Sequence, residues 1–177
     1  MNMRKKIAVF CSSSNSIDPK YNKVAREFVR AASLRGYDIV SGGTVKGMMG
    51  VISDELKSCG GYHIGVLPRF FKEYAYPEIS ELHWTDTMAE RKMLLRQGTC
   101  AVVALPGGIG TLDEIVDTFT LLSLGQYEGK VCLLNVDGFY DPFVSLLKKY
   151  VDEKMMAAET FEKLVVASSV EELLSKI

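Results

Sequence analysis

Residues 100–114 read CAVVALPGGIGTLDE, and they set the expected class of fold. The run from Cys100 to Leu105 is the most apolar in the chain, as is typical of a strand buried on both faces of a sheet. Three glycines follow within four residues, and a helical pattern then runs from Thr111 to Leu124, before Gly125. The stretch therefore predicts a buried strand, a glycine-rich loop and a helix in immediate succession.

The same alternation continues on both sides of this stretch. Further strands are predicted at residues 7–11, 37–41, 63–67, 81–85, 131–136 and 164–167. Helices are predicted at residues 18–34, from Gly47 to about Gly60, at 87–97, at 141–151 and from 169 onward, and residues 68–80 read as an aromatic loop. Strands that alternate with helices predict a Rossmann-like, doubly wound α/β fold, in which a parallel sheet carries helices on both faces.

Length and composition limit the class of protein. The 177 residues suit one domain, so residues 1–177 are expected to form a single nucleotide-binding domain. Hydrophobic residues make up 47% and charged residues 24%, which excludes general disorder. A formal net charge of −1 does not favour nucleic acid or an anionic membrane as the main partner, and two histidines are too few for a histidine-based metal site.

Cysteine usage and the N-terminus indicate a cytoplasmic protein. Four cysteines occur without a C-x-x-C pair, which favours reduced, mostly buried thiols over a disulfide framework. The apolar run after the basic N-terminus covers only residues 7–11, too short for a signal peptide or a membrane-spanning helix.

The glycine loop Pro106 to Thr111 is a candidate phosphate site. Glycines allow close approach of a ligand, and the free N–H groups and dipole of the following helix favour an anion. A tight turn without a ligand would need fewer glycines, so we favour a loop that binds a ligand over a simple turn. Two further loops, 11–15 and 41–50, are expected at the same sheet edge, and neither is a P-loop or a G-x-G-x-x-G fingerprint.

Charged residues near this loop have two interpretations each. Thr111-x-x-Glu114 has the spacing of a capping box, in which the glutamate satisfies only a backbone N–H; equally, Glu114 could face a ligand. Arg91 and Lys92 could lie on a solvated helix face, or could reach a ligand at the sheet edge. His63 and His83 lie in strand-like runs and are expected to be structural.

Several motifs together resemble the Lonely Guy (LOG) family. The segment Pro106-Gly107-Gly108-x-Gly110-Thr111-x-x-Glu114 matches the P-G-G-x-G-T-x-x-E signature of that family, and Met88-x-x-Arg91-Lys92 matches its second marker. Residues 9–14, 42–50 and 134–140 also resemble LOG proteins, so the similarity extends over nearly the whole chain.

The resemblance implies a cytokinin riboside 5′-monophosphate phosphoribohydrolase. Such an enzyme hydrolyses the N-glycosidic bond of a purine nucleoside 5′-monophosphate, either AMP or an N6-substituted nucleotide, and needs no cofactor or metal. Carried over to this sequence, the resemblance makes Arg91 and Glu114 catalytic. It assigns substrate binding to Ser13, Gly42, Gly43, Glu78, Lys92, Gly107, Gly108, Gly110, Thr111 and Thr120.

The sequence departs from the family at Ser12 and Thr44, where relatives usually have glycine, and Lys46 is unusual in this loop. These departures bear on substrate preference. Similar sequences are often labelled lysine decarboxylases; we reject that activity, because it needs a lysine-bound pyridoxal phosphate in a larger fold.

The sequence alone also allows functions other than hydrolysis of a nucleotide. A nucleotide-binding module that senses a ligand without hydrolysing it would use the same glycine loops, although it would not need both Arg91 and Glu114. A dinucleotide-dependent oxidoreductase is disfavoured by the missing fingerprint. The family resemblance and the aromatic residues Tyr74, Tyr76 and Trp84 predict a homodimer.

Overall fold

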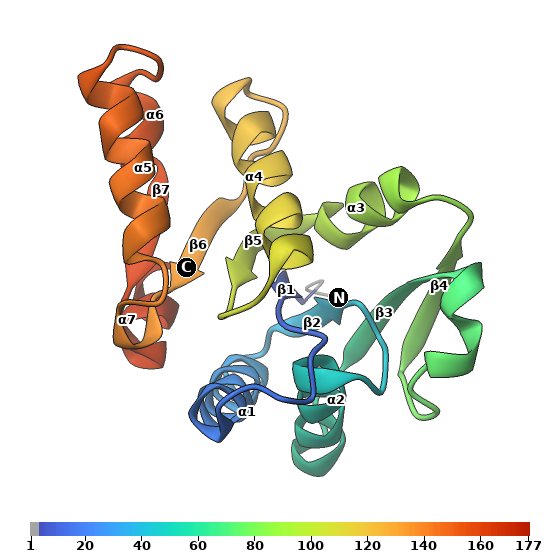
Figure 1. Cartoon of the computed structure of the whole chain (residues 1–177). Helices are drawn as coiled ribbons and strands as arrows, with labels where there is room; N and C mark the ends of the chain where they lie inside the picture. The colour runs from blue at the N-terminus through green and yellow to red at the C-terminus, as the bar shows by residue number, and fades with distance from the viewer. Residues whose placement is uncertain (1–3) are drawn as a thin grey trace.

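A seven-stranded parallel sheet forms the centre of the molecule. The computed structural model describes residues 4–177, and the strand order in the sheet is β4-β3-β2-β1-β5-β6-β7 (Figure 1). The strands are β1 (Lys6–Phe10), β2 (Asp38–Ser41), β3 (His63–Pro68), β4 (Glu81–Thr85), β5 (Thr99–Ala104), β6 (Lys130–Leu134) and β7 (Leu164–Ala167). The α-helices are α1 (Pro19–Leu34), α2 (Gly47–Cys59), α3 (Met88–Arg96), α4 (Ile109–Ser123), α5 (Asp141–Asp152), α6 (Ala158–Glu162) and α7 (Val170–Lys176). The predicted Rossmann-like α/β fold is confirmed.

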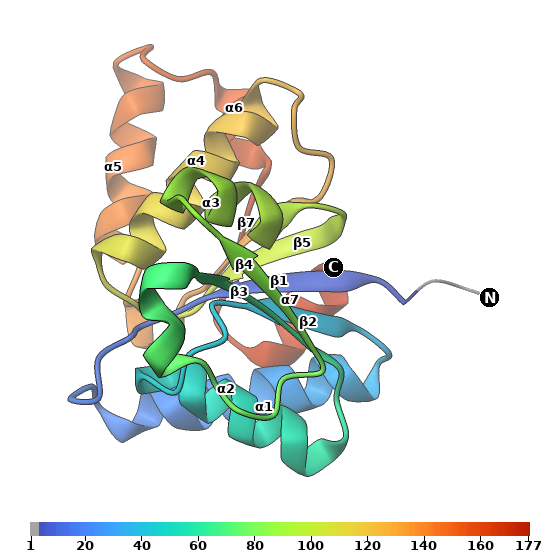
Figure 2. The same cartoon turned by 90° about the vertical axis from the view of Figure 1, so that its right-hand side faces the viewer.

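Two hydrophobic cores cover the two faces of the sheet. In β1, Ile7 and Val9 point to one face and Ala8 and Phe10 to the other, because side chains alternate along a strand. The first core packs under α1, α2 and α7, and the second packs under α3, α4 and α5. Figure 2 shows the resulting three layers. Burial on both faces explains why the central strands are continuous apolar runs.

Several helices begin at a residue whose side chain caps the helix N-terminus. Asp18 accepts from the backbone N–H of Lys20 at the start of α1, and Ser169 caps α7. Thr87 and Glu90 form a capping box at the start of α3. These local interactions fix where each helix begins.

Other predicted boundaries are wrong. The helix α4 begins at Ile109, two residues before the predicted start, so Thr111 lies inside the helix and does not cap it. By contrast, α5 begins at Asp141, as predicted. The segment predicted as a loop contains a 3-10 helix, η1 (Arg69–Tyr74), and a second one, η2 (Val136–Gly138), follows β6. Short helices such as these and α6 carry too few residues to show a period.

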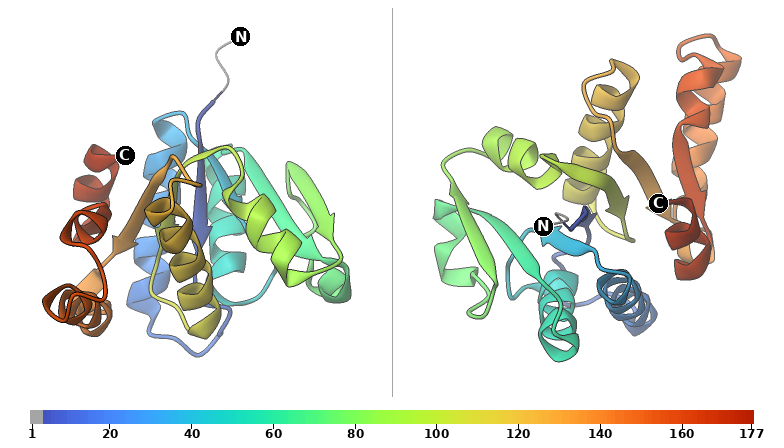
Figure 3. Two further views of the ribbon diagram at one scale, coloured as in Figure 1. Left: turned by 90° about the horizontal axis from the view of Figure 1, so that it is seen from above. Right: turned by 180° about the vertical axis from the view of Figure 1, so that it is seen from behind.

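The order of the strands identifies the edge where a ligand is expected. From β1 the chain adds β2, β3 and β4 on one side, and from β5 it adds β6 and β7 on the other. The carboxyl ends of β1 and β5 therefore lie at a topological switch point, where open α/β sheets bind ligands. The right panel of Figure 3 shows the opposite view of the same arrangement. No helix formed by residues 4–177 has the length and apolar character needed to cross a membrane.

Candidate functional site

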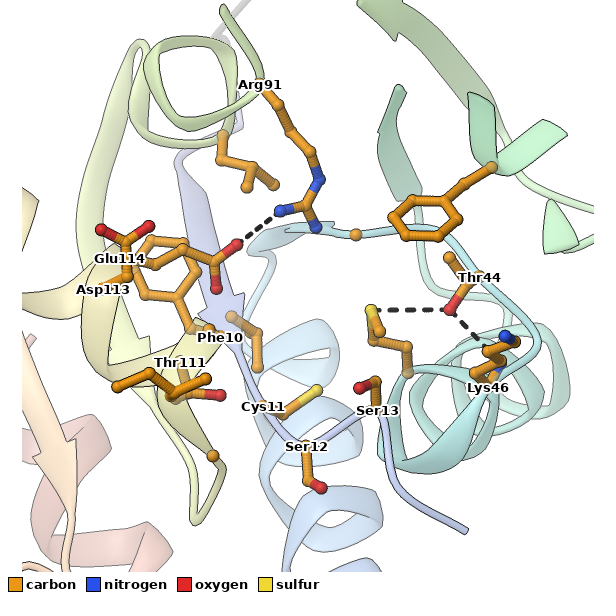
Figure 4. Close-up of a pocket in the computed structure, with 18 of the residues that line it drawn as sticks. Phe10, Cys11, Ser12, Ser13, Thr44, Lys46, Arg91, Thr111, Asp113 and Glu114 are labelled. Atoms are coloured by element: carbon orange, nitrogen blue, oxygen red, sulfur yellow. Dashed lines mark hydrogen bonds and ion pairs between the residues drawn. The ribbon is translucent and has the colours of Figure 1, made fainter. Parts of the chain in front are cut away.

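A cavity of about 510 Å³ opens at this switch point. Its walls come from five segments far apart in sequence: residues 9–14 after β1, 42–49 after β2, 68–74 around η1, 88–95 in α3 and 108–114 at the start of α4. Figure 4 shows the side chains that face it. The three loops that the sequence placed at one sheet edge all contribute to the cavity.

Arg91 and Glu114 form an ion pair inside the cavity. Nη1 of Arg91 donates to Oε1 of Glu114 at 2.6 Å, and the two side chains are 12% and 11% exposed (Figure 4). Nε of Arg91 also donates to the carbonyl oxygen of Val66 at 3.2 Å, which fixes the plane of the guanidinium. The pair is thus oriented and mostly withdrawn from water.

Gly42 makes room for this guanidinium. A Cβ atom at position 42 would lie 2.6 Å from Nη2 of Arg91 and 2.5 Å from Sδ of Met49. The first distance is too short for a real contact, so a larger residue would displace Arg91 from its place beside Glu114. Glycine is required here for space.

Burial perturbs the carboxyl group of Glu114. Loss of hydration raises the pKa of Glu114 above its ordinary value, and the positive charge of Arg91 opposes that rise. Perturbed carboxyl groups in a cavity are typical of reactive sites. The carboxylate can accept a hydrogen bond from water or stabilise a positive charge that develops close to it.

The N-terminus of α4 provides an anion site at the adjoining wall. The N-cap residue Gly108 has no side chain to satisfy the N–H groups of the first turn, and those groups lack intrahelical partners. Thr111 is 3% exposed, and its Oγ1 has no hydrogen-bond partner. Buried hydroxyl groups are normally paired, so this one is available to donate to a ligand in the cavity. The arrangement suits a phosphate.

The first loop is tied to the second by hydrogen bonds. The N–H of Gly47 donates to Oδ1 of Asn15 at 2.8 Å, and the N–H of Met48 donates to the carbonyl oxygen of Ser12 at 3.0 Å. Gly47 has a φ of 52° and its missing Cβ would lie 2.5 Å from the carbonyl carbon of Ser13, so only glycine fits. Ser13 is thereby held at the cavity wall.

The structure brings seven of the twelve predicted site residues to the cavity wall: Ser13, Gly42, Arg91, Gly108, Gly110, Thr111 and Glu114. The other five are Gly43, Glu78, Lys92, Gly107 and Thr120. Gly43 and Gly107 support the walls from behind, since Gly43 packs on Gly65 and Gly107 packs on Thr111.

The three remaining predicted residues have other partners. Glu78 pairs with Lys57 at 2.7 Å on an exposed loop. Lys92 pairs with Asp113 at 3.0 Å and with Asp117 at 3.4 Å. Thr120 is exposed and donates to the carbonyl oxygen of Val116.

Sequence reasoning did not assign a role in the site to Lys46, Phe71, Tyr74 or Met49, all of which line the cavity. Nζ of Lys46 lies 3.4 Å from the ring centroid of Tyr74. The unusual lysine in a glycine loop was the available signal. The aromatic residues of the segment 68–80 gave another, but the sequence could not show which way they point.

His63 has a structural place, as its sequence context indicates. Its Nε2 lies 2.8 Å from Oγ of Ser41, which in turn accepts from the N–H of Gly43 at 3.2 Å. Burial lowers the pKa of His63 to about 4, so the ring is neutral at physiological pH. This buried contact supports the second glycine loop.

Comparisons with known proteins identify relatives of the chain. A family model described as "Possible lysine decarboxylase" matches residues 49–177. The cytokinin riboside 5′-monophosphate phosphoribohydrolase LOG of Oryza sativa subsp. japonica is 35% identical over 175 residues, which cover 98% of this chain and 72% of the rice protein. The Arabidopsis thaliana phosphoribohydrolase LOG4 is 33% identical, over 97% of this chain and 81% of its own length.

Solved structures resemble the chain in fold. A molybdenum cofactor binding protein from Rippkaea orientalis superposes with a TM-score of 0.75 at 22% identity, covering 99% of this chain and 96% of that one. The molybdenum cofactor carrier protein of Chlamydomonas reinhardtii gives a TM-score of 0.73 at 20% identity, covering 98% and 96%. At such identities the similarity establishes the architecture alone.

Proposed function

Because the chain belongs to the Lonely Guy (LOG) family, we propose that it is a nucleoside 5′-monophosphate phosphoribohydrolase. The substrate class is the purine nucleoside 5′-monophosphates, of which AMP and N6-substituted nucleotides are the first to test. The products are the free base and ribose 5-phosphate. The observation that carries the proposal is the buried pair of Arg91 and Glu114 beside the start of α4, where backbone N–H groups and the Thr111 hydroxyl can donate to a phosphate.

The phosphate would bind at the start of α4. Backbone N–H groups of the first turn and the helix dipole favour its negative charge, and Oγ1 of Thr111 supplies a further donor. The phosphate lies remote from the bond that breaks. Its binding energy would hold the ribose in place while that bond reacts, so nucleosides without a phosphate should be poor substrates.

Glu114 would act on the ribose. When the bond between C1′ and the base nitrogen breaks, the base leaves with the bonding electrons and positive charge develops on the sugar ring. The carboxylate of Glu114 can stabilise that charge and accept a proton from the water that adds to C1′. A proton passes to the departing base, so that the reaction consumes one water.

Arg91 would orient the carboxylate and neutralise its charge before substrate binds. Its guanidinium is held by Val66 on one side and by Glu114 on the other. With Nη2 over Gly42, it also faces the cavity and can donate to the sugar or phosphate.

The direct experiment is incubation of the protein with AMP and with an N6-prenylated AMP, followed by chromatography for free base and ribose 5-phosphate. Release of base by wild-type protein, and its loss in Glu114→Gln prepared in parallel, would support the proposal. Binding of both nucleotides without release of base would instead indicate a sensing module.

A further inference from the structure

One end of the cavity has a chemistry that the phosphate and the ribose do not explain. Thr44, Lys46, Phe71 and Tyr74 gather there, from the loop after β2 and from η1. Backbone hydrogen bonds hold the two segments together, since the N–H of Val45 donates to the carbonyl oxygen of Tyr74 at 2.8 Å. We call these four side chains the distal wall.

The distal wall lies on the far side of Arg91 from Glu114. A chain of short contacts leads from one to the other. Nη2 of Arg91 and Sδ of Met49 both lie over Gly42, and the same sulfur atom is 3.6 Å from Oγ1 of Thr44. Figure 4 shows the same order across the cavity, with Glu114 and Thr111 on one side and Thr44 and Lys46 on the other.

Lys46 brings a positive charge to this wall. Its ammonium lies on the ring of Tyr74, and the ion pairs formed within residues 4–177 do not include it. The backbone N–H of Lys46 donates to Oγ1 of Thr44 at 3.3 Å, which fixes the position of that hydroxyl. Thr44 is 7% exposed. The wall thus presents a positioned hydroxyl at Thr44 and, over the ring of Tyr74, an ammonium that can only donate hydrogen bonds.

The location of the base follows from the proposed function, on which this inference rests. With the phosphate at the start of α4 and C1′ at Glu114, the base extends across Met49 toward Phe71 and the distal wall. A purine joined to ribose through N9 turns its N1 and C6 edge away from the sugar. That edge would meet Thr44 and Lys46.

We propose that Thr44 and Lys46 select a 6-oxopurine, so that the chain prefers IMP and GMP to AMP. The ammonium of Lys46 donates to the O6 carbonyl oxygen of such a base, and the N1–H of the base donates to Oγ1 of Thr44. Adenine has an amino group at C6. This group and the ammonium of Lys46 are both hydrogen-bond donors, so they could not pair. Buried polar groups left unpaired give strong discrimination between such bases.

The test compares kcat/KM for IMP and AMP in wild-type protein and in Lys46→Met, which keeps the length of the side chain and removes the charge. Calorimetry on the Glu114→Gln background gives the Kd of each nucleotide without turnover. We expect wild type to favour IMP by about tenfold or more in both measurements. In Lys46→Met this preference should fall to within about threefold of unity through loss of IMP binding. Lys148→Met, on the exposed face of α5, is the control and should keep the wild-type ratio.

Each outcome of this test either supports or overturns the proposal. A wild-type protein that binds and hydrolyses AMP as well as IMP overturns the proposed selectivity, whether or not Lys46→Met folds. An IMP preference that Lys46→Met leaves intact overturns the role of Lys46. If no nucleotide loses its base, the proposed hydrolase function fails, and the ratio of the two Kd values still tests the selectivity.

Discussion

Arg91 on α3 and Glu114 on α4 meet across the cavity, with Nη1 and Oε1 2.6 Å apart although 23 residues separate them in sequence. Among residues 4–177 the carboxylate of Glu114 has this guanidinium as its hydrogen-bond donor and caps no helix. The capping interpretation of Thr111-x-x-Glu114 is therefore wrong. A carboxylate that is not needed for the helix, and that is kept charged by a buried arginine, is available for chemistry.

Substitution of Glu114 by glutamine should separate catalysis from binding. Glutamine keeps the shape and an acceptor for Arg91 but removes the negative charge that would stabilise the ribosyl cation. We expect kcat for base release to fall about a hundredfold or more. Nucleotide binding should persist, because the phosphate donors at the start of α4 are mainly backbone groups. Rates come from chromatography and Kd from calorimetry.

The matched control is Asp117→Asn, which removes a carboxylate that pairs with Arg96 and Lys92 about one turn along α4 and outside the cavity. This variant should retain the wild-type rate, and the melting temperatures of the two variants show whether either is unfolded. A Glu114→Gln protein as active as wild type would mean that the charge of Glu114 has no part in catalysis.

The pH dependence of kcat should report the raised pKa of Glu114. The ionised form is the one proposed to act, and an acid with a raised pKa loses its charge at a higher pH than an ordinary glutamate. Activity should therefore fall, as the pH is lowered, through a limb that lies above the ordinary value of 4.5. The profile of kcat, measured at saturating nucleotide, excludes ionisation of the free substrate. A limb at or below 4.5 would contradict the assignment.

Removal of the Thr111 hydroxyl should weaken phosphate binding without harm to the fold. Oγ1 of Thr111 is buried without a partner, so Thr111→Val should leave the melting temperature of the free protein unchanged or higher. The Kd of AMP should rise about tenfold, as expected for the loss of a hydrogen bond to a charged group, while that of adenosine should not change. Calorimetry gives both constants.

Thr118→Val is the control for Thr111→Val. Thr118 is equally buried on α4, but its hydroxyl donates to the carbonyl oxygen of Glu114 at 2.9 Å. Its loss should lower the melting temperature and leave the ratio of AMP to adenosine affinity unchanged. An unaltered AMP affinity in Thr111→Val would place the phosphate elsewhere.

Most of the fold was predictable because local signals and burial agree. Short apolar runs such as residues 100–105 are stable as strands that are buried on both faces of a sheet. The starts of two helices are set by local hydrogen bonds at Asp18-Pro19 and Thr87-x-x-Glu90. The predicted start of α4 lies two residues after its observed start, because the N-cap is Gly108, which has no side chain to mark the helix start in the sequence. The helix η1 was missed because a single short turn shows no period.

The candidate site was predictable where it depends on sheet topology and not where it depends on side-chain direction. Parallel strands bring the loops after β1, β2 and β5 to one edge, which is why Ser13, Gly42 and Thr111 share a cavity. The sequence could not show that Lys92 turns away toward Asp113, or that Lys46 turns onto Tyr74. Such choices depend on which partner lies within reach in the folded chain.

The interface of the predicted homodimer would lie on α3 and α4. Two of the three aromatic residues that supported the prediction beside the family resemblance have partners within the chain. The ammonium of Lys46 lies over the ring of Tyr74, and Tyr76 donates to Asp54. Apolar side chains are exposed on α3, on α4 and at the C-cap of α4, and the two helices are joined by the ion pairs of Lys92 and Arg96. These side chains are Met88, Met93, Ile109, Val116 and Leu124, with exposed fractions from 39% to 83%.

Exposed apolar side chains on two helices that lie against each other are typical of a surface that another protein covers. A second copy of the chain would bury the outward faces of the two helices that carry Arg91 and Glu114. Light scattering at micromolar concentration should give twice the chain mass of 19.6 kDa for wild type. Val116→Asp places a charge at the middle of α4 and should give the monomer mass. Leu146→Asp, at a similarly exposed apolar residue of α5, should remain dimeric, and a wild-type protein that scatters as a monomer would rule the interface out.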